Sequence, residues 1–225
     1  MTNHLAAQLR ALLRGTGGAD AASPAGRGMV ALAIIAIGSA MMYGAIMGSY
    51  GLLNGGPAVQ ILYGAIKAPI LLFVTFALTL PSFLVVNTLL GLRDDLPTVL
   101  HALFSAQAVV AIALLSLSPL TLFWYVSVTD YNLAILFNGL MFALASLGAQ
   151  RPLRVRYAPL IRRNRRHGSM LKLWLVAYAF VGIQMGWVLR PFIGRLGMPA
   201  QFFRDEKWDN AYVIVAGMIW RALTH

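Results

Sequence analysis

Residues Ile61 to Leu92 read ILYGAIKAPILLFVTFALTLPSFLVVNTLLGL, and this stretch decides the fold. It contains a single charged residue, Lys67, and two prolines, Pro69 and Pro81. About 20 apolar residues in an α-helix cross a hydrocarbon core about 30 Å thick. The stretch is longer than that and too apolar for the core of a soluble protein. We therefore expect a membrane protein in which this segment is tilted, kinked or begins at the membrane surface.

The composition of the whole chain agrees with a membrane location. Among its 225 residues, 59% are hydrophobic and 11% are charged, whereas soluble globular chains are about 25% charged. This number of charged residues is too small to cover the surface of a soluble protein. We therefore expect lipid to contact much of the chain. Cysteine is absent, which excludes disulfides, thiolate metal sites and cysteine nucleophiles.

Further apolar segments follow the same pattern along the chain. They cover residues 29–53, 100–128, 131–150 and 173–189. Residues 190–225 form an aromatic-rich loop and a short apolar segment, 210–223, which fits a sixth span or an interfacial helix equally well. The arm of residues 1–28 has leucines at helical spacing, which fits an amphipathic surface helix as well as a disordered tail. The prediction is an all-α polytopic bundle of five or six transmembrane helices.

Small residues at four-residue spacing mark two of the predicted helices. They are Ala36, Ala40, Gly44 and Gly48 in the first span, and Gly182 and Gly186 in the fifth. Small side chains let helix backbones approach closely, which favours association where lipid removes the hydrophobic force. The partner helix belongs either to the same chain, the commoner case in multi-span proteins, or to another subunit. We predict that these residues are helix-packing sites.

Two polar residues of the second span are candidates for a substrate path. If Pro69 marks the start of the true span, Lys67 lies near the membrane surface, where its stem can snorkel toward water. The alternative is a buried cation that faces a substrate path or an anionic lipid. For Asn87, near the other end, we expect hydrogen bonds to a neighbouring helix.

Residues 151–172, RPLRVRYAPLIRRNRRHGSMLK, are the most polar region, with eight arginines and lysines and no acid. Lysine and arginine concentrate in cytoplasmic loops, so we expect a basic loop on that side. Counting spans backwards places residues 93–99 and the N-terminus in the cytoplasm as well. The turns at 54–60 and 129–130 then face outward.

Within this region, four arginines are the strongest candidates for a contact site: Arg162, Arg163, Arg165 and Arg166. Such a cluster attracts anionic lipid headgroups at about 1 kcal/mol per residue near the surface. It can equally pair with an acidic or phosphate-bearing partner through bidentate guanidinium geometry. The alternative is that the cluster only sets the membrane topology. A loop tethered at the bilayer rarely meets nucleic acid, so we do not expect that partner.

The sequence lacks the usual signatures of catalysis. No aspartate or glutamate lies well inside an apolar span, which argues against proton relays and carboxylate-driven ion coupling. The four histidines are scattered, and no metalloprotease, P-loop or serine hydrolase motif occurs. We predict no enzymatic activity, no cofactor and no metal site.

The chain has about five spans, with Tyr43-Gly44 in the first and prolines in the second. This pattern of the spans resembles the Yip1-like family. Its members are small integral membrane proteins, and the eukaryotic ones help to organise membrane traffic. The resemblance covers residues 29–189, although the N-terminal arm lacks an acidic DLxGP-type motif. Residues 60–91 and 182–194 also look like segments of uncharacterised bacterial membrane proteins. These resemblances imply fold and location and transfer no site residues.

The resulting expectation is a non-enzymatic membrane subunit or scaffold in a bacterial inner membrane. Small-residue faces would pack against protein partners or a second copy, and the basic loop would contact anionic lipid or a cytoplasmic component. The runner-up is a small transporter or channel with a path near Lys67 and Asn87. A membrane enzyme would require the arginines and residues 201–210 to form one pocket. A hydrated cavity at the polar residues of the spans favours transport, whereas helix–helix hydrogen bonds favour a scaffold.

Overall fold

The computed structural model describes residues 25–194, 200–203 and 211–224, and this part of the chain is helical without any strand. The α-helices are α2 (Ala25–Leu53), α3 (Val59–Leu89), α4 (Leu96–Ser127), α5 (Tyr131–Arg163), α6 (Arg166–Val188) and α7 (Ala211–Thr224), with a 3-10 turn, η1, at Arg93–Asp95. The predicted all-α bundle is confirmed. The amphipathic arm predicted for residues 1–28 falls mostly outside the described residues.

Five of the helices, α2 to α6, are long and apolar enough to cross a membrane. Their outer faces carry large apolar side chains that the chain leaves uncovered, such as Leu89, Val126 and Val176. The chain is therefore a multi-pass membrane protein. Helix α7 is a shorter apolar helix, and its Tyr212 hydroxyl donates a hydrogen bond to the Phe180 carbonyl of α6 at 2.6 Å.

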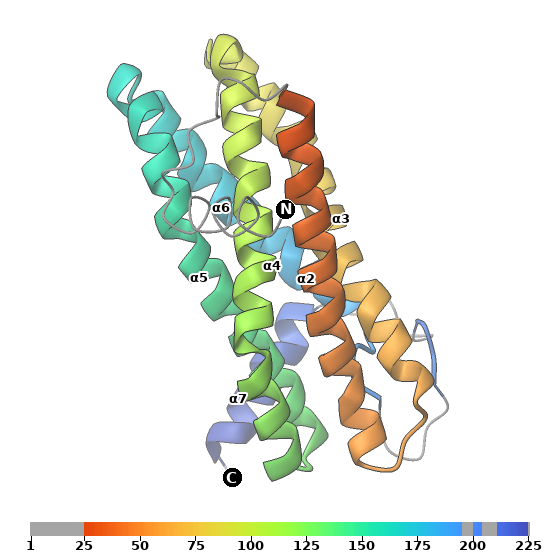
Figure 1. Ribbon diagram of the computed structural model, residues 1–225. Helices are drawn as coiled ribbons and strands as arrows, with labels where there is room; N and C mark the ends of the chain where they lie inside the picture. Colours follow the sequence, from red (N-terminus) through yellow and green to blue (C-terminus); the bar gives the residue numbers. More distant parts are fainter. Residues whose placement is uncertain (1–24, 195–199, 204–210, 225) are drawn as a thin grey trace.

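The spanning helices alternate in direction, as Figure 1 shows. Helix α2 packs against α3 and α4, α4 packs against α5, and α3 packs against α6, while α5 and α6 contact each other sparsely. The predicted antiparallel pairing of the third and fourth spans is confirmed. One end of the bundle gathers residues 90–95 and 162–167, and we call it the arginine end. The other gathers residues 50–60, 129–130 and 189–194, and we call it the lysine end.

The first predicted ribbon of small residues packs within the chain. Ala36 and Ala40 are buried. A Cβ on Gly44 would clash with the Gly64 carbonyl oxygen of α3 and lie 2.7 Å from the Ala68 Cβ. A Cβ on Gly48 would lie 2.6 Å from the Ile61 Cα. The α2 and α3 backbones therefore approach so closely that only glycine fits at these two crossings.

The second predicted pair behaves differently. A Cβ on Gly182 would make an ordinary contact of 3.5 Å with Thr75 of α3, and a Cβ on Gly186 would meet nothing within 4 Å. Gly182 therefore lies in a helix contact that does not need glycine. Gly186 therefore has no close helix partner among the described residues, and its predicted packing role, against another subunit, stays a prediction.

The predicted basic loop at 151–172 is wrong in its secondary structure. Helix α5 continues through the basic residues to Arg163, and α6 begins at Arg166, so only two residues separate the helices. Arginine has a high helix propensity, and a helix that leaves the bilayer satisfies its own backbone without apolar side chains. The change of polarity at residue 151 therefore marks a change of environment along one continuous helix.

Candidate functional site

At the arginine end, Asp95 joins the two connections of the bundle. Its Oδ1 accepts a hydrogen bond from Arg163 Nη1 at 3.0 Å, and its Oδ2 lies 3.0 Å from His167 Nε2. The Asp95 side chain is 18% exposed and that of His167 is fully buried, whereas the Arg163 side chain is 74% exposed. One carboxylate therefore connects the turn before α4 to both sides of the turn between α5 and α6.

The four candidate arginines divide into two pairs. Arg163 binds Asp95, and Arg166 Nη1 donates to the Leu90 carbonyl oxygen at 3.0 Å. Arg162 and Arg165 are exposed, and neither forms a hydrogen bond or ion pair with another described residue. The first pair therefore fixes the arginine end, and the second pair is available to an external anion.

Buried polar groups without partners lie behind this cluster. His167 Nδ1, the Tyr157 hydroxyl and both amide atoms of Asn87 have no hydrogen-bond partner among the described residues. The helix–helix hydrogen bonds predicted for Asn87 are therefore wrong, although its side chain is buried. Sequence analysis did not identify Asp95 and His167 as partners. The available signal was that an acidic turn and a basic stretch were assigned to the same side of the membrane.

At the lysine end, Lys67 is buried by the segment that follows α6. Its Nζ donates a hydrogen bond to the Pro191 carbonyl oxygen at 2.8 Å and lies 4.8 Å from the centroid of the Phe202 ring. Gln60 Nε2, two turns earlier on α3, donates to the same carbonyl at 2.9 Å. Lys67 and Pro191 are 124 positions apart along the chain.

The expected snorkelling of Lys67 is wrong, because its side chain is fully buried. Within the described residues the ion pairs all involve Asp95, so no described carboxylate pairs with Lys67. Its charge is held by a carbonyl dipole and by aromatic faces, both of which attract a cation. Snorkelling fails here because Pro191 and Phe202 cover the position that an open helix end would leave to water.

Two other polar residues of the spans, Gln107 and Asn138, make hydrogen bonds between helices. Tyr178 of α6 donates to Gln107 Oε1 of α4 at 2.7 Å. Asn138 of α5 donates to the Tyr125 hydroxyl of α4 at 2.6 Å and accepts a longer bond of 3.4 Å from Tyr43 of α2. These buried bonds connect four of the five spanning helices.

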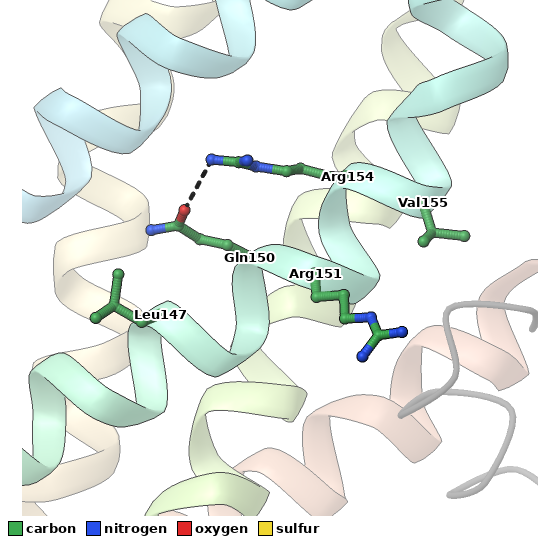
Figure 2. A pocket seen from close by; sticks show the side chains of 5 residues that line it. All are labelled: Leu147, Gln150, Arg151, Arg154 and Val155. Carbon is green, nitrogen blue, oxygen red and sulfur yellow. Dashed lines mark hydrogen bonds between the residues drawn. The ribbon is translucent and has the colours of Figure 1, made fainter.

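A groove of about 360 Å³ lies on the outer side of α5, lined by Leu147, Gln150, Arg151, Arg154 and Val155. Figure 2 shows Arg154 turned back toward Gln150, to whose Oε1 its Nη2 donates at 3.1 Å. The groove is open and is formed by one helix, so it is a surface site and not an enclosed chamber. Sequence analysis did not single out these residues as a group.

No group of three histidine, cysteine, aspartate or glutamate side chains in the described ranges is arranged to hold a metal ion. Most of the 201–210 region, which an enzyme site would require, lies outside those ranges. Comparison with known proteins assigns no relative: no family model matches the chain, and no curated protein or solved structure is significantly similar to it. The resemblance to the Yip1-like family therefore stays a prediction.

Proposed function

We propose that the chain is a non-enzymatic membrane component, a subunit or scaffold, whose arginine end contacts anionic lipid or an acidic cytoplasmic partner. The observation that carries the proposal is the division of the four arginines. Arg163 and Arg166 hold the two connections together, which presents Arg162 and Arg165 on a fixed frame. A rigid frame reduces the conformational entropy that an arginine contact must overcome.

The bonding of polar groups within the spans supports a scaffold over a transporter. Gln107 and Asn138 are bonded between helices, and Lys67 is bonded to the Pro191 carbonyl. These are packing contacts that stabilise one arrangement of the helices. The uncovered apolar face and the open Gly186 of α6 leave room for a partner helix.

We propose that the protein lies in a bacterial inner membrane, with its N-terminus and its arginine end in the cytoplasm. The positive-inside rule supports this orientation. The lysine end would then face outward, and its described cations include the buried Lys67 and also Arg190, whose guanidinium lies over the Trp187 ring.

The experiment is purification of the tagged chain in mild detergent, followed by identification of co-purifying proteins and native mass determination. We expect a stoichiometric complex, or anionic lipid bound at the arginine end itself, that is lost in Arg162→Gln/Arg165→Gln. The control Arg162→Lys/Arg165→Lys keeps both charges and should retain the contact. A bare monomer that behaves identically in all three forms would overturn the proposal.

A small transporter is the second candidate, and one observation favours it. Lys67 is a fully buried cation without a described acidic partner, and ionisable groups inside spans often mark substrate paths. Uptake of a substrate abolished by Lys67→Ala, with the protein still folded, would support this function over the scaffold.

A further inference from the structure

The groove on α5 lies deeper along the bundle than the arginine end. The bonds of Asn138 to Tyr125 and of Arg163 to Asp95 fix the register of the antiparallel helices α4 and α5. By that register Arg154 lies about level with Gln107. Arg151 lies about 18 Å along α5 from Arg163, at about 1.5 Å per residue.

Apolar, uncovered surface surrounds this level of the bundle. Tyr178 binds Gln107 and so brings α6 to the same height, and one turn or less to either side α6 exposes Val176 by 69% and Phe180 by 60%. Leu147 in the groove is itself 61% exposed. Side chains of this kind face lipid acyl chains in a membrane protein. The guanidinium groups of the groove therefore lie beside uncovered apolar surface, between two and four turns along α5 from Arg163.

These guanidinium groups have no carboxylate partner among the described residues. Arg154 binds the neutral amide of Gln150, and Arg151 forms no hydrogen bond or ion pair with another described residue. Each guanidinium has five donors. A charged side chain beside hydrocarbon is costly unless a counter-ion, water or local thinning of the bilayer accompanies it. An anion in the groove would supply the missing counter-ion, and beside uncovered apolar surface the lipid headgroups of the membrane are the most abundant source of one.

We propose that this groove binds one anionic phospholipid, with the phosphate between Arg151 and Arg154 and an acyl chain along Leu147. Guanidinium groups bind phosphate oxygens in bidentate geometry. The arginines are three positions apart, so they lie on the same side of α5. In Figure 2 the Arg154 guanidinium is turned toward Gln150 and that of Arg151 points away from it, so both side chains must change rotamer to hold one phosphate between them. The groove has the size of a small-ligand site, and its apolar wall suits an acyl chain and not a free anion.

The inference rests on the proposed function in taking anionic lipid as the ligand, but it uses different arginines. The test is native mass spectrometry of the full chain released from detergent, titrated with phosphatidylglycerol or with phosphatidylcholine. We expect one tightly held phosphatidylglycerol per chain and much weaker phosphatidylcholine binding. In Arg151→Gln/Arg154→Gln the affinity should fall about thirtyfold, since each cation contributes about a factor of five.

Two further variants keep the outcome decisive. Arg162→Gln/Arg165→Gln should leave the tight lipid in place, and Arg151→Lys/Arg154→Lys should bind with intermediate affinity because lysine lacks the planar fork. If Arg162→Gln/Arg165→Gln alone removes the lipid, the proposed function stands and the groove site is overturned. If only the groove variants remove the tight lipid, the groove site stands, and the contact of the arginine end is decided separately by the purification experiment above.

The remaining results would each overturn the groove site. They are equal binding of phosphatidylglycerol and phosphatidylcholine, displacement of the lipid by millimolar inorganic phosphate, and unchanged lipid binding in Arg151→Gln/Arg154→Gln. Co-purification of an acidic protein in place of the lipid would assign the groove to a partner helix. If Arg151→Gln/Arg154→Gln does not fold, the lysine variant decides: binding equal to that of the unmodified chain contradicts the bidentate contact.

Discussion

The two ends of the bundle accommodate positive charge in opposite ways. At the arginine end, Arg163 and His167 share one carboxylate, that of Asp95, beside water. At the lysine end, Lys67 is buried against the Pro191 carbonyl and the Phe202 ring. Ion pairs near water contribute little because solvent screens them. A buried cation without a carboxylate depends on every dipole around it.

This difference separates the roles of the two ends. The arginine end has exposed cations to spare, so it suits contact with an external anion. The lysine end uses its cation internally, to attach the segment after α6 to α3. Changes at Lys67 should therefore act on stability, and changes at Arg162 and Arg165 should act on binding.

The largest effect is expected from reversing the charge at the lysine end. Lys67→Glu would place a carboxylate against the Pro191 carbonyl oxygen, and the free energy of unfolding should fall by about 3–5 kcal/mol, as for a broken buried charge contact. Thermal unfolding of the purified chain in detergent measures the change.

Lys67→Met is the matched control, because it keeps the length of the side chain without the charge. Gln60 still donates to the Pro191 carbonyl, so the loss should stay within about 1 kcal/mol. The contradicting outcome is that Lys67→Met lowers the free energy of unfolding as much as Lys67→Glu does. That result would show that the lost ammonium contacts, and not the buried carboxylate charge, cause the destabilisation.

A methyl group at the helix crossing of the lysine end should have the next largest effect. Gly48→Ala places a Cβ against the Gln60 backbone, which pushes the start of α3 away from α2 and costs about 1–3 kcal/mol of overpacking. Gly38→Ala, on the same helix, meets nothing within 4 Å and should be neutral or slightly stabilising. Equal melting temperatures for the two variants would refute the close approach.

The smallest effect is expected at the carboxylate of the arginine end. Asp95→Asn removes its charge, and since Arg163 is mostly exposed the loss should be about 1 kcal/mol. Asp94→Asn is the control, because exposed Asp94 makes no ion pair with a described residue. The difference between the two variants should shrink in high salt, where screening is stronger. A difference that is independent of salt would indicate a packing role for Asp95.

The spans and their alternation were predictable because apolar length alone determines them. The use of the small residues was only partly predictable. Gly44 and Gly48 share their spacing with Gly182 and Gly186, yet only the first pair lies at a crossing that excludes a Cβ. Spacing identifies a helix face on which a close approach is possible, and the neighbouring helix decides whether it occurs.

The candidate sites were harder to predict because their contacts join distant parts of the chain. Lys67 meets Pro191, and Asp95 meets His167, and neither pairing has a signature within one segment. A change from apolar to basic residues at Arg151 suggested a loop, although helix formation does not depend on side-chain polarity once the backbone bonds are internal.

The central claim is that the two ends face opposite sides of the membrane, with the arginine end toward the cytoplasm. Because the chain has no cysteine, single cysteines at the exposed positions Arg165 and Ala58 report each end without background. In intact bacterial spheroplasts, a membrane-impermeant maleimide should label Ala58→Cys at once and Arg165→Cys only after permeabilisation. Labelling of Arg165→Cys in sealed spheroplasts, with Ala58→Cys protected, would contradict the account.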